Sequence, residues 1–480
     1  MQTENKLGVM PISKLIWNMS LPIIASMLVQ ALYNIVDSMF VARICEQALT
    51  AVSLAFPAQN LMIGLATGTA VGMNALFGRS LGAREYHHAN KVAINGVFLA
   101  FMGFVLSAVV ALCFARVFFA AQTDIDYIIE QGTVYLHICC GCSIGIFGEI
   151  MFERILQGTG RSILSMCSQG LGAITNIILD PIFIFDEFRV FGLTIHGFNK
   201  GVAGAAIATV IGQCVACTFA IILNLTKNPD VQLRLKGFRP NLRVIGNIYA
   251  IGLPSVIMIA VGSVMTFLMN KILITYHEAR ETAATAFGIY FKLNSFIFMP
   301  VFGMNNGIVP IVAYNYGAQN RARLVETIKR GVTYVALIML FGMGLFEAFP
   351  GTLLRLFDAT DTLIAVGTPA LRIIALSFSF AGVCIGFGSS FQALGKSMYS
   401  MVTSIVRQLV VLIPAAFLLA RYGVTVGNSD LVWWSYPIAE VFSLALTLLF
   451  FRRVYRTVIR DLPLNGVTKQ KIQEQIEEEP

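Results

Sequence analysis

The sequence predicts an all-α membrane protein in which twelve transmembrane helices form two parallel six-helix repeats, an N-lobe and a C-lobe, around a central cavity. Three observations support this fold class: the composition, a series of long apolar segments, and an internal repeat. Apolar residues make up 56% of the 480 residues and charged residues only 12%, whereas a soluble domain carries about 25% charged residues. The deficit runs through the whole chain, so no polar half is large enough for an independent soluble domain.

The apolar segments have the length of membrane spans, because a transmembrane helix needs about 20 mostly apolar residues. Twelve of them cover residues 15–43, 51–78, 92–121, 127–157, 162–185, 200–225, 244–276, 282–313, 325–350, 362–393, 397–421 and 432–455. The predicted organisation is a cytoplasmic N-terminus (1–14), the N-lobe (15–225), a cytoplasmic linker (226–243), the C-lobe (244–456) and a cytoplasmic tail (457–480).

Two motifs recur in the second half of the chain at one constant offset. Gly68, Gly72, Gly82, Ala83, Gly96 and Val97 return as Gly303, Gly307, Gly317, Ala318, Gly331 and Val332, and Phe152-x4-Gln157-x2-Gly160-Arg161-Ser162 returns as Phe387-x4-Gln392-x2-Gly395-Lys396-Ser397. Two motifs in one register indicate a duplication. Because each copy crosses the bilayer an even number of times, the repeats are predicted to be parallel, an arrangement found in secondary transporters.

The basic residues indicate the orientation of the chain. The net charge is +8, and Lys and Arg concentrate in the loops that lie inside if the N-terminus is cytoplasmic. This bias fits the positive-inside rule, with both termini in the cytoplasm. We therefore interpret the basic excess as a topology signal, and we expect the lipid bilayer and not nucleic acid as a partner.

Sequence motifs of enzymes are absent. There is no GxxxxGK[ST] loop, no H-E-x-x-H and no G-x-S-x-G, so we expect neither catalysis nor a cofactor. Two cysteine pairs, Cys139/Cys142 and Cys214/Cys217, have the C-x2-C spacing of a metal or redox site. No His or third Cys lies at ligand spacing, and we interpret both pairs as small packing residues at helix contacts.

A deep acid, Asp37, lies well inside the first segment. Ionisable groups in membrane spans are costly and usually face a cavity or a partner. Gln30, Tyr33, Asn34 and Asp37 have the spacing that places side chains on one helix face. This stripe either lines a functional site or forms structural hydrogen bonds between helices, and its terminal acid favours function.

The second deep acid is Asp180, within Asn176-x3-Asp180-Pro181. Asn176 and Asp180 share a helix face, and Pro181 lacks an N–H, which leaves an earlier helical carbonyl free. Two carboxylates in a low-dielectric environment cannot both ionise cheaply. Carboxylate and amide oxygens therefore suit either Na⁺ or a shared proton. The alternative is that Asp180 is a plain helix-end acid near the outer surface.

Three other charged residues are candidates. We expect Gln30 and Asn34 to line the substrate cavity. Lys292 is an intramembrane cation that either faces the same cavity or extends to the outer surface. Glu149 and Glu153 are one turn apart near the inner end of the fourth segment. They form either a cytoplasmic gate or a solvated helix end.

Taken together, the sequence resembles the multidrug and toxic compound extrusion (MATE) family of twelve-helix antiporters over residues 12–456. The resemblance rests on Pro22, Asp37, Gly78-Arg79-x2-Gly82-Ala83, Gln157-Gly158-Thr159-Gly160-Arg161, Asn176-x3-Asp180-Pro181, Gly201-Val202-x-Gly204-Ala205-Ala206-x-Ala208-Thr209, Pro300-x2-Gly303 and Tyr314-Asn315-Tyr316-Gly317-Ala318.

The resemblance implies which residues bind the coupling cation. In the prokaryotic branch that binds this cation in the N-lobe, the matching ligands are Asp37, Asn176, Asp180 and Thr209, with Tyr33 beside the first, and Pro22 is the hinge. Another branch adds acids in the seventh and tenth helices. This chain has none from Val256 to Tyr276 and none in the tenth segment after Asp361, which favours the N-lobe site alone.

The resemblance implies a secondary active multidrug efflux transporter that exchanges amphipathic or cationic organic compounds for H⁺ or Na⁺ by alternating access. We expect a monomer in the plasma (inner) membrane of a prokaryote, with small organic molecules as substrates. One alternative is a flippase or exporter of lipid-linked saccharides or of a metabolite on a related fold, and Lys292 is the feature that favours it. Another is a membrane receptor that binds its ligand without transporting it.

Overall fold

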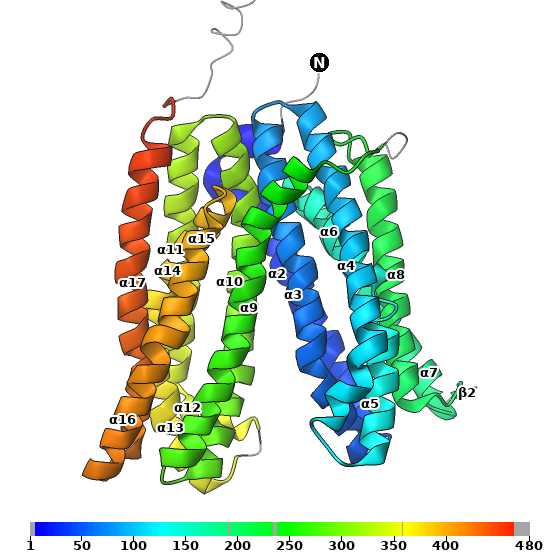
Figure 1. Cartoon of the computed structure of the whole chain (residues 1–480), viewed down its shortest axis with the longest axis vertical. Helices are drawn as coiled ribbons and strands as arrows, with labels where there is room; N and C mark the ends of the chain where they lie inside the picture. The colour runs from blue at the N-terminus through cyan, green and yellow to red at the C-terminus, as the bar shows by residue number, and fades with distance from the viewer. Residues whose placement is uncertain (1–4, 191–192, 234–237, 358, 465–480) are drawn as a thin grey trace, which may run out of the picture. The chain divides into compact units, whose positions relative to one another are not determined.

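The computed structural model describes residues 5–190, 193–233, 238–357 and 359–464, and most of them form long helices (Figure 1). Ten helices in these ranges are long and apolar enough to cross a membrane. Two further pairs, Asp126–Cys139 with Ile144–Gly158 and Asp361–Ala375 with Phe378–Ala393, are bent by 42° and 48°. When each bent pair counts as one span there are twelve, so the predicted fold class is confirmed.

The long helices follow the predicted segments closely. The first half contains α1 (Lys6–Val9), α2 (Ile12–Ala42), α3 (Glu46–Gly82), α4 (Tyr86–Ala120), α5 (Asp126–Cys139), α6 (Ile144–Gly158), α7 (Ser162–Ile184), β1 (Glu187–Val190), β2 (Leu193–His196) and α8 (Gly201–Lys227). The second half contains α9 (Leu242–Tyr276), α10 (Arg280–Gly317), α11 (Arg321–Ala348), α12 (Pro350–Arg355), α13 (Asp361–Ala375), α14 (Phe378–Ala393), α15 (Ser397–Ile405), η1 (Val406–Leu412), α16 (Ile413–Val426), η2 (Ser429–Trp434), α17 (Ser435–Val454) and η3 (Tyr455–Ile459).

A short hairpin between α7 and α8 departs from the helices and loops that the sequence predicts. Strands β1 and β2 pair antiparallel, with Glu187 opposite His196 and Val190 opposite Leu193. Each strand has four residues, which is too short for a clear alternation of apolar and polar residues. Most of the predicted tail, residues 465–480, lies outside the described residues.

The chain divides into two compact units, and the division falls inside two helices. The N unit comprises Leu21–Val256, and the C unit comprises the residues up to Ser20 together with those from Ile257 onward. The boundaries therefore lie beside Pro22 in α2 and Pro254 in α9. The start of α9 belongs to the N unit and the start of α2 to the C unit. The predicted lobes, residues 15–225 and 244–456, have other limits than these compact units, and the division into these lobes remains a prediction.

This division explains the glycines that recur in the two halves. In the N unit, a Cβ on Gly72 of α3 would lie within 3.0 Å of the carbonyl oxygen of Ile248 in α9. In the C unit, a Cβ on Gly307 of α10 would lie 3.0 Å from the Cα of Ser20 in α2. Gly72 thus allows α3 to approach the start of α9 at backbone distance, and Gly307 allows α10 to approach the start of α2 in the same way.

The second repeated motif forms the same turn twice. Gly160, after α6, has φ 86°, and Gly395, after α14, has φ 71°. The N–H of Gly160 donates to the carbonyl of Gln157 at 2.9 Å, and the N–H of Gly395 donates to the carbonyl of Gln392 at 3.0 Å. A left-handed residue that closes a helix is usually glycine, which accounts for the recurrence of this residue in both copies.

We expect Gly160→Ala to lower the melting temperature of the purified protein, because a left-handed backbone costs an L-residue about 1–2 kcal/mol. Gly395→Ala should lower it by a similar amount. Gly170→Ala is the matched control, since its Cβ would meet nothing within 4 Å and its φ is not in the left-handed range. Equal melting temperatures for Gly160→Ala and Gly170→Ala would contradict this explanation of the motif.

Candidate functional site

Two glycines bring α7 and α8 together in the N unit, beside the predicted cation ligands. A Cβ on Gly172 of α7 would lie 2.9 Å from the carbonyl oxygen of Gly212 in α8, so the two backbones are in direct contact there. One turn after Gly172 on α7 and one turn before Gly212 on α8, the Nδ2 of Asn176 lies 3.3 Å from the Oγ1 of Thr209. The close packing of these helices thus places the amide next to the hydroxyl.

The two deep aspartates join this pair. Asp180 lies one turn after Asn176 on α7, and the Nδ2 of Asn176 donates to its Oδ1 at 3.2 Å. Asp180 is fully buried, and Asp37 of α2 is 8% exposed. The two carboxylates lie within electrostatic reach of each other. Asp180 is therefore not a solvent-exposed acid, and its role as a cation ligand remains a prediction.

Several oxygens of this group have no donor. Among the residues that the structure describes, Asp37 Oδ1, Asn176 Oδ1 and Asp180 Oδ2 are buried without a hydrogen-bond partner. A buried acceptor left without a partner costs about 1–3 kcal/mol, and more when it is charged. Carboxylate, amide and hydroxyl oxygens are ligands for hard cations, and paired carboxylates also share protons. The arrangement can therefore hold either Na⁺ or H⁺.

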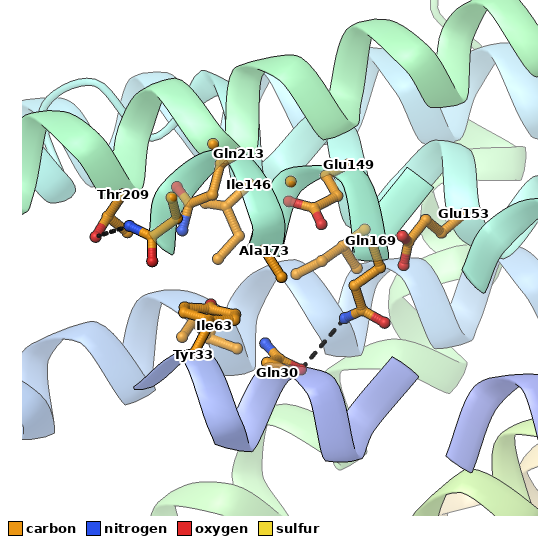
Figure 2. Close-up of a pocket in the computed structure, with 14 residues that line it drawn as sticks. Gln30, Tyr33, Ile63, Ile146, Glu149, Glu153, Gln169, Ala173, Thr209 and Gln213 are labelled. Atoms are coloured by element: carbon orange, nitrogen blue, oxygen red, sulfur yellow. Dashed lines mark hydrogen bonds between the residues drawn. The ribbon is translucent and has the colours of Figure 1, made fainter. Parts of the chain in front are cut away.

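A small pocket of about 50 Å³ adjoins this cluster, and six of its polar lining residues come from α2, α6, α7 and α8 (Figure 2). They are Gln30, Tyr33, Glu149, Glu153, Asn176 and Thr209. Gln169 of α7 donates through Nε2 to the Oε1 of Gln30 at 3.3 Å. The predicted stripe on α2 therefore divides: Gln30 and Tyr33 line the pocket, whereas Asn34 is exposed. The hydrogen bond of Gln30 shows that part of the stripe also joins helices.

Glu149 and Glu153 face the same pocket, as Figure 2 shows. They are only 9% and 7% exposed, so the alternative of a solvated helix end is wrong. Ser168 donates to the Oε1 of Glu153 at 3.1 Å. Arg161, which follows α6, pairs with Asp230 and not with these acids. The signal that pointed to the pocket was the one-turn spacing of the two acids, which puts both on one face of α6.

Two further predicted residues lie apart from this cluster. Pro22 lies inside α2, which is helical on both sides of it. Lys292 belongs to α10 of the C unit and is exposed, with its Nζ 5.8 Å from the centre of the Phe357 ring. Its contribution to a substrate cavity, like that of Asn34, remains a prediction.

The cysteines of α8 contact the glycines of α6. A Cβ on Gly145 would lie 2.8 Å from the backbone N of Cys214, and one on Gly148 would lie within 3.0 Å of the Sγ of Cys217. All nine cysteines are free. These contacts match the interpretation of Cys214 and Cys217 as packing residues at the contact between α6 and α8.

Comparison with known proteins assigns the family. A family model described as MatE matches the chain twice, at residues 22–182 and 254–418. The chain belongs to the MatE family. The two matches begin at the prolines Pro22 and Pro254 and support the duplication. MatE proteins are membrane transporters and not enzymes.

Individual MatE relatives cover nearly the whole chain. The multidrug export protein MepA of Staphylococcus haemolyticus is 27% identical over 435 residues, which are 89% of this chain and 91% of that protein. A crystal structure of MATE in complex with MaD3S is 25% identical, has a TM-score of 0.87 and covers 96% of this chain and 100% of that one. An outward-facing multidrug resistance MATE transporter of the MOP superfamily has 23% identity and a TM-score of 0.86, with the same coverage.

Proposed function

We propose that this MatE protein is a secondary multidrug exporter that expels amphipathic, often cationic, organic compounds in exchange for H⁺ or Na⁺. The name of its relative, multidrug export protein MepA, supports multidrug export. The observation that carries the exchange is the set of buried oxygens of Asp37, Asn176 and Asp180 that have no donor among the described residues. These oxygens need a proton or a cation, which is the ligand that an antiporter takes up while it releases its substrate.

In this proposal the cation binds to Asp37 and Asp180, with Asn176, Thr209 and Tyr33 around them, and neutralises the carboxylates. The first membrane span, α2, then bends at Pro22, and the affinity of the protein for the organic substrate falls. The unit boundary between Ser20 and Leu21 lies one residue before this proline, whose missing N–H weakens the helix there. Because coupling free energy is reciprocal, the substrate must lower the affinity for the cation by the same factor.

The remaining assignments complete the proposal. Gln30, Asn34 and Lys292 contact substrate in the central cavity, and Glu149 and Glu153 act as a cytoplasmic gate. The chain works as a monomer in the plasma (inner) membrane of a prokaryote, with both termini in the cytoplasm.

The proposal is tested with purified protein in liposomes loaded with a fluorescent amphipathic cation such as ethidium. A proton gradient and a sodium gradient are imposed separately. We expect one of the two to drive ethidium out against its own gradient. Binding of ethidium without any flux would indicate a receptor, and transfer of a labelled lipid-linked saccharide without ethidium flux would indicate a flippase. Either result would overturn the proposal.

Thr209→Val should raise the concentration of the coupling cation needed for half-maximal efflux by about tenfold, because valine keeps the shape of threonine and removes one oxygen that can bind the charge. The measurement is ethidium efflux at a series of proton or sodium concentrations. Thr218→Val is the control, since Thr218 also lies on α8 but is exposed and bonds the carbonyl of Cys214. An unchanged concentration dependence for Thr209→Val would remove Thr209 from the cation site.

A further inference from the structure

The C unit contains a second and larger cavity, which the proposed function does not use. Its volume is about 310 Å³, at the lower end of the range for small-molecule sites. Aromatic rings form much of its wall, among them Tyr290, Phe298, Phe378 and Tyr436. Arg407 and Glu440 supply the charges.

This cavity occupies the same place in the second repeat as the N-unit pocket occupies in the first. Ile63, Ile146, Gly172 and Ala173 line the N-unit pocket, and at the constant offset of the duplication they correspond to Phe298, Ala381, Arg407 and Gln408, which line the C-unit cavity. The duplication therefore produced a hollow in each unit. The chemistry differs, because a glycine of the first copy is an arginine in the second.

The charged pair in this cavity is only partly satisfied. The Nη1 of Arg407 donates to the Oε1 of Glu440 at 2.6 Å. Within the described ranges, Glu440 is the one hydrogen-bond partner of a guanidinium that has five N–H donors. The side chain of Arg407 is 27% exposed, while that of Glu440 is 8% exposed. Donors of Arg407 are therefore available to a ligand.

Acceptors in the same cavity are also free. Among the described residues, Glu440 Oε2 and Asn294 Oδ1 are buried without a hydrogen-bond partner, and both residues line the cavity. A ligand that carried only a carboxylate or only an ammonium would leave one net charge in a buried site, which is costly. A ligand with both groups would satisfy the donors and the acceptors and keep the site neutral.

We propose that the C-unit cavity binds an aromatic zwitterion, whose carboxylate bonds the guanidinium of Arg407 and whose ammonium bonds Glu440 and Asn294. The planar fork of arginine matches a carboxylate, and the surrounding rings pack against the aromatic body of the ligand. This site is separate from the cation site of the N unit and does not depend on transport.

The test measures binding of tritiated tryptophan to the purified full-length protein in detergent, without any ion gradient. Unlabelled tryptophan, indole-3-propionate and tryptamine compete; they carry both charged groups, only the carboxylate and only the ammonium, respectively. We expect tryptophan to compete best. Arg407→Gln should weaken tryptophan and indole-3-propionate by about tenfold or more, as expected for a lost charge-assisted bond, but should not weaken tryptamine. Glu440→Gln should show the opposite selectivity.

Three controls make the result decisive. Arg372→Gln removes an exposed arginine of α13 and should leave binding unchanged. The double variant Arg407→Gln with Glu440→Gln keeps a neutral hydrogen-bonded pair, so it should fold and still lose tryptophan binding. Gly262→Leu fills the cavity, since a Cβ there would meet only the Oε1 of Gln408, at 3.6 Å, and should abolish binding of all three compounds.

Absence of displaceable tryptophan binding to the native protein would overturn the proposal. Equal weakening of all three compounds by Arg407→Gln would also overturn it, because the arginine would then act only on the fold. Asp37→Asn should retain tryptophan binding. Failure of the antiport mechanism and failure of this site are therefore distinguishable.

Discussion

Ion-driven efflux by the Asp37→Asn variant is expected to fall to the level of protein-free liposomes. Asparagine has nearly the same shape as aspartate but no negative charge, so the cation would lose one of the two carboxylates that we propose as its ligands. Substrate release would then no longer be linked to cation entry. The measurement is ethidium efflux from liposomes under an imposed proton or sodium gradient.

The matched control for this variant is Glu326→Gln, which removes a half-exposed acid that pairs with Arg330 in α11. This change should leave both folding and efflux unchanged, because exposed ion pairs contribute about 0–1 kcal/mol. Thermal melting of both variants shows that they are folded. Full ion-driven efflux of every substrate tested by Asp37→Asn would contradict the role of this residue.

The second large effect is expected at the close helix contacts of each unit. Gly72→Ala places a Cβ within 3.0 Å of the carbonyl oxygen of Ile248, and a backbone atom in a helix cannot move aside. Overpacking of this kind costs about 1–3 kcal/mol and sometimes more. We expect a clear loss of folded protein and a lower melting temperature, measured by size-exclusion chromatography and thermal melting.

Gly307→Ala should have a similar effect in the C unit, where the Cβ would lie 3.0 Å from both the N and the Cα of Ser20. Gly246→Ala on α9 is the control, because its Cβ would meet nothing within 4 Å. If Gly72→Ala and Gly246→Ala are equally stable, the repeated glycines do not serve close helix packing.

Much of the fold could be predicted from the sequence, because twelve apolar segments and one repeat define it. The two bent spans could not. The break at Cys140–Ser143 and the one at Leu376–Ser377 consist of small or apolar residues, which leave the hydrophobic segment uninterrupted. The unit boundary was hidden for a related reason: it passes through the middle of α2 and α9, whereas loops are the usual sign of a boundary.

The proposed cation site could be predicted in part from the residues, because Asp37 and Asp180 are deep acids, whereas Thr209 was implied only by the resemblance to a family. The sequence alone places Asn176 beside Asp180 on one helix, and it does not say that Thr209 of α8 lies 3.3 Å from this amide. That proximity depends on the contact between Gly172 and Gly212, which is a property of two helices together. For the same reason the inward orientation of Glu149 was left open.

The second half of the chain differs most from the sequence interpretation. The seventh predicted span (α9) contains no acid from Val256 to Tyr276, and the tenth (α13 and α14) contains none after Asp361. This absence suggested that only the first copy carries a charged site. Glu440 lies in α17, and its partner Arg407 lies in η1. These residues are far apart in the sequence, and neither has a charged neighbour on its own helix turn that would reveal the pair. The repeat thus retained a hollow in both units and changed the groups that line it.

The most direct test of the antiport mechanism reverses the direction of coupling. Liposomes containing the native protein receive an ethidium gradient and no ion gradient, and a pH-sensitive dye and radioactive sodium report ion movement. The antiport mechanism predicts that ethidium flow drives H⁺ or Na⁺ in the opposite direction and that Asp37→Asn abolishes this ion flow. Ethidium flow with neither ion moving, or ion flow that Asp37→Asn leaves intact, would contradict it.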